Sequence, residues 1–384
     1  MHGYAVIHPG LEAVVEAELS GLGVSGERCP GGVRFAADPA KIAALARAMR
    51  TPSQLLVEVA HGSARSTEAL GGLVRQVPWK QWFNPLAEVH VEVSSKGSAL
   101  RFKENITRSV FGLIREARKG PFSPDWVGRL KFAQRVQVRI FDDEATISID
   151  AGGDLLHRRG WRTEAGKAPI RENLAACLLA LAEWDGTDAL MDPFCGSGTI
   201  LIEGALLAAN RSPFVGRGLA CDEWQNLGAS ALGAPGRSGA KPPPRGAPRR
   251  APNSAVKPTS APLTRSNVPI VGSDHHAATL LAAEANARRA GVSIQFRRAE
   301  IEDIAPCAVV GTIVSNMPYG ERLGDRVGEV YTNFGRVLRE RFQSWRVVFL
   351  TTERSLAERV DKRAERLTQF KNGGIGVAAW SFLP

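Results

Sequence analysis

Short apolar runs alternate with amphipathic stretches along the first 155 residues of the chain. Strands are predicted over residues 4–7, 31–35, 54–60, 88–95, 135–141 and 144–151. Helices are predicted over residues 10–23, 38–50, 66–77 and 103–119. Asp38 and Ser66 are typical helix N-caps, and Asp142 with Asp143 is expected to form the turn of a hairpin. The pattern indicates two successive α+β units.

From Ile170 onward, strands and long helices alternate regularly. Strands are predicted over residues 189–192, 269–274, 294–300, 309–316 and 345–352. Helices are predicted over residues 170–184, 198–210, 276–292 and 330–342. Several of these strands are apolar throughout, as in parallel sheets covered by helices on both faces. The sequence therefore predicts a doubly wound, Rossmann-like α/β domain.

A segment of low complexity interrupts this α/β pattern. Residues 228–267 contain eight of the 23 prolines and almost no large apolar side chains. Such a composition buries too little surface to offset the entropy of ordering the chain. We expect a disordered Pro/Arg-rich insertion. An insertion without a function is the simpler interpretation, and a contribution to nucleic-acid affinity is the alternative.

The net charge of +10 is concentrated in two places. Residues 228–267 hold seven Lys or Arg and no acid, and residues 101–139 hold ten Lys or Arg against three acids. The rest of the chain is therefore slightly acidic. Within the second segment, six residues are candidates for contacts with phosphates. They are Arg108, Arg115, Arg118, Lys119, Lys131 and Arg135. A solvated helix face is the alternative interpretation.

Other classes of protein find little support in the sequence. The N-terminus lacks the pattern of a signal peptide, and no apolar run is long enough to cross a bilayer. The five cysteines and seven histidines form no cluster with ligand spacing. We expect a cytoplasmic protein without a metal site or a membrane segment.

Three candidate ligand-binding features follow predicted strands, where a doubly wound sheet binds its ligands. The turn "DPFCGSGT" starts at Asp192, and its glycines Gly196 and Gly198 would let a ligand approach the backbone. Asp274 is placed to bind ribose hydroxyls, although it is also a plausible helix N-cap. Glu300 is either a contact for an adenine amino group or a surface acid. The dinucleotide and phosphate-loop fingerprints are absent, which favours a ligand without a pyrophosphate.

The stretch "SNMPYG" follows the apolar run that ends at residue 314. Asn316 offers an amide oxygen, Met317 a backbone carbonyl, and Tyr319 an aromatic face beside Pro318. Together with "DPFCGSGTILIEGA", "GSD" and "AEIEDI", this stretch resembles the S-adenosylmethionine-dependent methyltransferases of exocyclic amino groups, whose motif is (N/D)-P-P-(Y/F/W). The segments "GWRTEAGKAPIRENLAA", "PWKQWFNP" and "FKNGG" are more specifically similar to bacterial guanine-N2 methyltransferases of large-subunit ribosomal RNA.

The resemblance implies an organisation and a set of roles. It implies a ferredoxin-like subdomain over residues 1–45, an RNA-binding THUMP domain over 46–155 and a methyltransferase domain over 160–384. S-adenosylmethionine is the implied cofactor, and large-subunit ribosomal RNA or a pre-ribosomal particle the implied partner. The implied cofactor contacts are Asp192, Phe194, Gly196, Ser197, Gly198, Asp274, Glu300, Ile301, Asn173 and Pro169. The family more often has Asp at position 300 and Pro at position 317.

For the reacting amine, the resemblance implies a positioning mechanism. Asn316 and the Met317 carbonyl would accept the two N–H bonds, while Tyr319 would stack on the flipped base. Three alternatives stay open: a transfer-RNA substrate, an adenine or protein-glutamine substrate, and a non-catalytic RNA-binding assembly factor. Attack by Cys195 on a pyrimidine is the least favoured chemistry, because a small residue in a cofactor turn explains that cysteine. The sequence does not indicate an oligomeric state.

Overall fold

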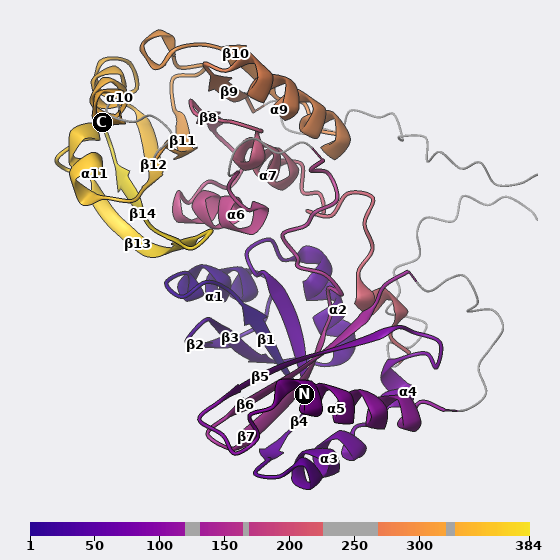
Figure 1. The fold of residues 1–384 in the computed structure, drawn as a ribbon. Coiled ribbons are helices and arrows are strands. Elements are labelled where there is room, and N and C mark those ends of the chain that lie inside the picture. Colours follow the sequence, from indigo (N-terminus) through magenta and orange to yellow (C-terminus); the bar gives the residue numbers. More distant parts are fainter. Residues whose placement is uncertain (120–130, 164–168, 226–267, 320–326) are drawn as a thin grey trace, which may run out of the picture.

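The computed structural model describes residues 1–119, 131–163, 169–225, 268–319 and 327–384. Two seven-stranded sheets organise these residues, one in the N-terminal part of the chain and one in the C-terminal part (Figure 1). The predicted insertion at 228–267 lies outside the described residues. Among those that are described, no helix is long and apolar enough to span a bilayer.

The N-terminal sheet has the strand order β2-β3-β1-β4-β7-β6-β5. Its strands are β1 (His2–Val6), β2 (Gly26–Cys29), β3 (Gly32–Ala36), β4 (Gln54–Ser63), β5 (Val89–Lys96), β6 (Gln134–Phe141) and β7 (Glu144–Asp150). β1 and β4 pair antiparallel, which joins the two predicted α+β units into a single sheet. β5 and β6 are the parallel pair at one edge.

Two of the five helices described in this part begin at predicted N-caps. They are α1 (Glu12–Gly21), α2 (Pro39–Ala48), α3 (Thr67–Gln76), α4 (Trp79–Trp82) and α5 (Lys103–Ala117). Asp38 accepts a hydrogen bond from the Lys41 backbone N–H at 2.7 Å, and Ser66 accepts one from Ala69 at 3.1 Å. Both predicted N-caps are thereby confirmed. The predicted hairpin turn is also confirmed, since Asp142 and Asp143 both have positive φ between β6 and β7.

The C-terminal sheet has the strand order β10-β9-β8-β11-β12-β14-β13. Its strands are β8 (Ala189–Asp192), β9 (Ile270–Asp274), β10 (Gln295–Arg298), β11 (Gly311–Asn316), β12 (Trp345–Thr351), β13 (Glu365–Asn372) and β14 (Ile375–Phe382). The accompanying helices are α6 (Glu172–Leu181), α7 (Thr199–Ala208), α9 (Ala277–Ala290), α10 (Val327–Arg341) and α11 (Arg354–Val360), with 3-10 turns η2 (Ala220–Glu223) and η3 (Ile301–Asp303).

The strand order of this sheet reverses beside β8. From β8 the chain runs outward through β9 to β10, then returns to place β11 on the other side of β8. β8, β9, β10, β11 and β12 pair in parallel, as predicted, so their carboxyl ends lie along one edge. The reversal leaves a crevice between the ends of β8 and β11, the usual ligand position in this class of fold. The antiparallel strands β13 and β14 were not predicted.

Buried polar contacts connect the two parts of the molecule. The side chains of Arg159 and Glu203 are fully buried and form an ion pair of 3.0 Å. Arg159 also donates a hydrogen bond to the Arg50 carbonyl oxygen at 2.5 Å. Asn173, in the first turn of α6, donates to the Thr51 carbonyl oxygen at 3.2 Å. Because buried polar groups need these partners, the contacts fix how the N-terminal sheet sits against the C-terminal sheet.

Candidate functional site

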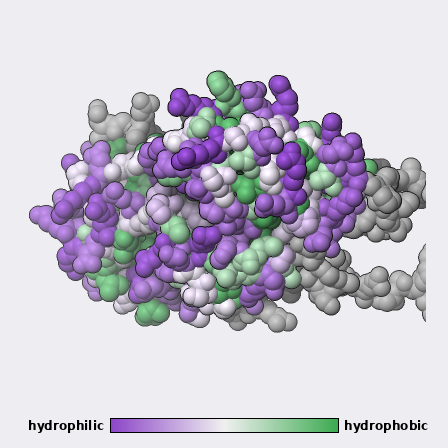
Figure 2. All heavy atoms as spheres, turned by 90° about the horizontal axis from the view of Figure 1, so that it is seen from below, coloured by the Kyte–Doolittle hydropathy of each residue, from purple (hydrophilic) through white to green (hydrophobic). Residues whose placement is uncertain are grey.

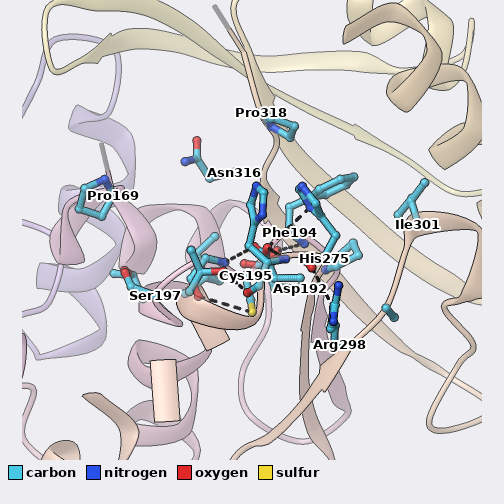
Figure 3. A pocket seen from close by; sticks show the side chains of 18 of the residues that line it. Pro169, Asp192, Phe194, Cys195, Ser197, His275, Arg298, Ile301, Asn316 and Pro318 are labelled. Atoms are coloured by element: carbon cyan, nitrogen blue, oxygen red, sulfur yellow. Dashed lines mark hydrogen bonds and ion pairs between the residues drawn. The ribbon is translucent and has the colours of Figure 1, made fainter. Parts of the chain in front are cut away.

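A cavity of about 1090 Å³ opens at the strand ends where the order reverses (Figure 3). Residues from the ends of β8, β9 and β11 line it together, although they are far apart in the sequence. Ten of the predicted site residues line the cavity: Pro169, Asp192, Phe194, Gly196, Ser197, Asp274, Glu300, Ile301, Asn316 and Pro318. The fold therefore brings these ten residues together around one cavity.

The turn after β8 is held by the Asp192 carboxylate. Ser315 Oγ donates to Asp192 Oδ1 at 2.7 Å, and the Phe194 backbone N–H donates to the same oxygen at 3.1 Å. Gly198 does not line the cavity but begins α7 with φ of 80°, where a Cβ would lie 3.2 Å from the Ala283 Cβ. Its role is therefore to let the turn pack against α9.

The Asp274 carboxylate joins two loops at the cavity. It accepts hydrogen bonds from the Gly196 N–H at 3.1 Å and from the His276 N–H at 2.9 Å. His276, not Asp274, is the N-cap residue of α9, so the alternative interpretation of Asp274 as a helix cap is wrong. The carboxylate instead fixes the glycine turn against the end of β9.

Burial strongly perturbs the acid at the base of the site. It raises the pKa of Asp192 to about 7, and nearby Asp274 adds to the rise, while the hydrogen bonds from Ser315 and Phe194 oppose it. The same desolvation, together with these two carboxylates, raises the pKa of the Cys195 thiol well above its usual value. A thiol kept protonated is a poor nucleophile, which argues against covalent catalysis by Cys195.

The motif after β11 places its residues in different environments. Asn316 ends the strand at the cavity, and its buried Oδ1 has no hydrogen-bond partner. The Pro318 carbonyl oxygen accepts a hydrogen bond from the Tyr331 hydroxyl at 3.2 Å. The Met317 side chain is fully buried in the core, beneath the cavity edge. Among these residues, Asn316 is thus the one that presents an unsatisfied acceptor.

Tyr319 and Asn173, like Gly198 and Met317, do not line the cavity. Tyr319 is only 5% exposed, and its hydroxyl accepts a hydrogen bond from Asn372 Nδ2 at 2.9 Å. The aromatic face of Tyr319, which was expected to be open for stacking, is therefore buried in this structure. The Nδ2 of Asn173, an expected cofactor contact, instead donates to the Thr51 carbonyl oxygen at the junction of the two sheets.

The sequence did not identify the residues of the β9–α9 loop as part of the site. His275, His276 and Thr279 line the cavity, as does Arg298 at the end of β10. Arg298 donates a hydrogen bond to the His275 carbonyl oxygen at 3.2 Å, which connects the end of β10 to the β9–α9 loop on this side of the cavity (Figure 3). The adjacent histidines directly follow Asp274, which was the available signal. No group of three His, Cys, Asp or Glu that could hold a metal occurs among the described residues.

The predicted phosphate-contacting residues divide into exposed and buried ones. Arg108, Arg115, Lys119 and Lys131 are exposed, and the end of the molecule seen in Figure 2 is largely hydrophilic. Arg118 is 6% exposed, and its guanidinium donates to the carbonyl oxygens of residues 84, 85 and 87. The prediction that Arg118 contacts RNA is therefore wrong, because its side chain points inward and donates hydrogen bonds to backbone carbonyl oxygens of a loop.

Arg135 is a half-buried member of the same predicted set. Its guanidinium lies 3.3 Å from Glu92 and 4.0 Å from Asp154. The positive charge of Arg135 is thus largely balanced within the sheet, and it contributes less to an anion-binding surface than the exposed lysines.

Comparison with known families identifies the fold and its class. Residues 159–379 match the RMKL-like methyltransferase domain, residues 3–56 the RlmL ferredoxin-like domain and residues 64–150 the THUMP domain. The chain belongs to the RMKL-like methyltransferase family. S-adenosylmethionine is the cofactor of this class.

Similar proteins cover nearly the whole chain. A putative RNA methyltransferase, YpsC of Bacillus subtilis, is 30% identical over 95% of this chain and 91% of its own length. The ribosomal RNA large subunit methyltransferase K/L of Methylococcus capsulatus is 33% identical over 97% of this chain, which spans only 50% of that protein. A solved structure of a predicted N6-adenine-specific DNA methylase from Listeria monocytogenes is 27% identical, with a TM-score of 0.79, covering 100% of this chain and 96% of its own.

The residues of the cavity fit S-adenosylmethionine. Asp192 and Asp274 place two carboxyl groups beside the glycine turn, which suits the cationic methionine part and the ribose hydroxyls. Phe194 and Ile301 supply apolar surface on the same cavity. Pockets for drug-sized ligands measure roughly 300–1,000 Å³, so this cavity also has room for part of a substrate.

The Asp192→Asn variant tests the burial of the carboxylate. A raised folded-state pKa means that the folded protein binds the extra proton between about pH 4 and 7, so Asp192 costs stability increasingly as the pH rises. We expect Asn, which keeps the acceptor oxygen, to raise the melting temperature relative to wild type by several degrees more at pH 8 than at pH 4.5, since about 1 kcal/mol corresponds to about 2–4 °C. Scanning calorimetry across this pH range measures the melting temperatures of both proteins. A difference in melting temperature that does not change with pH contradicts the raised pKa of Asp192.

Proposed function

We propose that this protein transfers the methyl group of S-adenosylmethionine to the exocyclic N2 amino group of a guanine in large-subunit ribosomal RNA. The single observation that carries the reaction type is the buried, unpartnered Asn316 Oδ1 at the cavity edge. A buried acceptor without a donor is costly, and an incoming N–H group would satisfy it. An amino group of a base supplies such a donor.

The proposed mechanism activates a poor nucleophile by positioning it. The lone pair of an aromatic amine is delocalised into the ring, so the free amine attacks slowly. Asn316 Oδ1 accepts a hydrogen bond from one N–H group of the amine, and the Met317 carbonyl oxygen accepts one from the other. These two hydrogen bonds turn the nitrogen lone pair toward the methyl group. The Pro318 carbonyl is already engaged by Tyr331, which favours Met317 as the second acceptor. S-adenosylmethionine supplies the electrophilic methyl group, and the amine proton leaves after transfer.

Tyr319 is proposed to shape the base-binding edge rather than to stack in the conformation described. Asn372, the last residue of β13, donates a hydrogen bond to its hydroxyl at 2.9 Å. This contact gives the closing segment "FKNGG" a function, because it connects the last hairpin to the residue that follows Pro318. Stacking on the flipped base would then require Tyr319 to move out of the core.

Three observations support a structured RNA as substrate. The THUMP domain match covers residues 64–150, the exposed basic residues of α5 belong to that part, and K/L of Methylococcus capsulatus is named for ribosomal RNA. α5 lies at the end of the molecule away from the strand ends of β8 and β11 (Figure 1). A substrate that contacts both α5 and these strand ends must be large, as a structured RNA is. Transfer RNA is the second candidate, since the same basic face would accept it.

A catalytic protein is favoured over a non-catalytic assembly factor. Asp192, Asp274 and Asn316 line one cavity, as the chemistry requires, and the glycine turn between them keeps its left-handed residues. A fold that had lost its activity would have no need to retain the unsatisfied Asn316 acceptor.

Asn316→Ala tests the proposed reaction directly. We expect the variant to lose methyl transfer by at least about 100-fold, because removing one positioned hydrogen-bonding group typically costs that much. Its affinity for S-adenosylmethionine should stay nearly unchanged. Met317→Pro is the matched control at the neighbouring position: it keeps the carbonyl and is expected to remain active. Transfer of tritiated methyl groups to RNA measures both variants, and full activity of Asn316→Ala refutes the mechanism.

The substrate is tested in cells that lack this protein. We expect one N2-methylguanine to disappear from large-subunit ribosomal RNA, while transfer RNA keeps all of its methylguanines. Nucleoside mass spectrometry of the two purified RNA classes measures both, with the complemented strain as control. Unchanged ribosomal RNA together with a methylguanine missing from transfer RNA rejects the proposed substrate in favour of the second candidate.

A further inference from the structure

A second cavity, which we call the arginine pocket, lies beside the first. It has a volume of about 500 Å³, and five arginines and a histidine contribute to its lining. These residues are His157, Arg158, Arg159, Arg162, Arg171 and Arg217. Pro169 and Ile170 line both cavities, so the arginine pocket adjoins the cavity at the strand ends.

The positive charge of the arginine pocket is only partly balanced. Three of its arginines have carboxylate partners: Arg158 with Asp154 at 3.0 Å, Arg159 with Glu203 at 3.0 Å and Arg162 with Glu172 at 2.8 Å. The other two have no carboxylate within ion-pair distance in the described part of the chain. Arg217 donates to backbone carbonyl oxygens, and Arg171 lies 3.4 Å from His8 Nε2. The pocket therefore carries excess positive charge.

Two buried nitrogen atoms of the arginine pocket have no hydrogen-bond partner. They are Nδ1 of His157 and Nη1 of Arg162. Burial lowers the pKa of His157 to about 4, and the charges of Arg171, Arg159 and Arg158 lower it further, so the ring is neutral at pH 7. Buried polar atoms without partners are rare, and the oxygen atoms of a bound anion are acceptors of the kind that the Arg162 nitrogen lacks.

We propose that the arginine pocket binds a backbone phosphate of the RNA substrate, next to the nucleotide whose base enters the catalytic cavity. This inference rests on the proposed function. Guanidinium groups are planar donors that suit phosphate oxygens, and phosphate contacts fix the register of a nucleic acid on its protein. The shared wall of Pro169 and Ile170 places the backbone of a flipped nucleotide near the arginines.

Arg171 is the residue to change, because its side chain has no carboxylate partner and does not line the catalytic cavity. We expect Arg171→Ala to weaken binding of an unmethylated large-subunit ribosomal RNA transcript by about tenfold, the effect of losing a charge-assisted hydrogen bond. The dependence of log Kd on log salt should lose about 0.7 of its slope, equivalent to one phosphate contact on a single strand. Arg171→Lys should recover most of the affinity.

Arg354→Ala on α11 removes the same charge from an exposed position and is the matched control, expected to bind RNA as the wild type does. Fluorescence anisotropy at several salt concentrations measures RNA binding, and calorimetry measures binding of S-adenosylmethionine to the same proteins. Unchanged RNA affinity in Arg171→Ala overturns the pocket while leaving the proposed function intact. Weakened cofactor binding instead assigns the pocket to the cofactor carboxylate and also overturns it. A wild-type protein that binds neither ribosomal nor transfer RNA overturns the proposed function itself.

Discussion

The hydrogen bond between Ser315 and Asp192 joins the two strand ends on which the site depends. Ser315 belongs to β11 and Asp192 to β8, which become neighbours only because the strand order reverses there. The bond fixes the start of the glycine turn relative to Asn316, one residue further along β11. Asp274 then fixes the middle of the same turn through the Gly196 N–H. Three segments of sequence are thereby held in one geometry before any ligand arrives.

This preorganisation places carboxyl groups in a buried position. Burial raises the pKa of Asp192 to about 7, so the site is sensitive to charge near neutral pH. A cationic ligand favours the ionised form, which explains why a cofactor with a positively charged methionine part suits the cavity. Arg298 lines the cavity, but the other basic residues described above lie elsewhere, on α5 and in the arginine pocket. This separation of acidic and basic groups matches a cationic cofactor on one side and a polyanionic substrate on the other.

The sequence predicted those features that depend on local pattern. The parallel strands, the caps at Asp38 and Ser66 and the strand-end acids all follow from periodicity and turn chemistry. The hairpin of β13 and β14 was missed because β13 is an exposed edge strand with only Phe370 buried. The orientations of Arg118, Asn173 and Tyr319 were missed because each depends on a partner distant in the chain. The arginine pocket was missed for the same reason, since residues 157–162, residues 169–171 and Arg217 meet only in the folded protein.

The proposed function depends most directly on binding of S-adenosylmethionine in the cavity through the acids at the strand ends. Isothermal titration of the full chain with this cofactor tests that claim, with Asp274→Ala as the comparison. We expect one saturable site in the wild type and an affinity at least about tenfold lower in the variant, corresponding to about 1.4 kcal/mol. Absence of binding to the wild type at millimolar cofactor, or equal affinities of the two proteins, would contradict it.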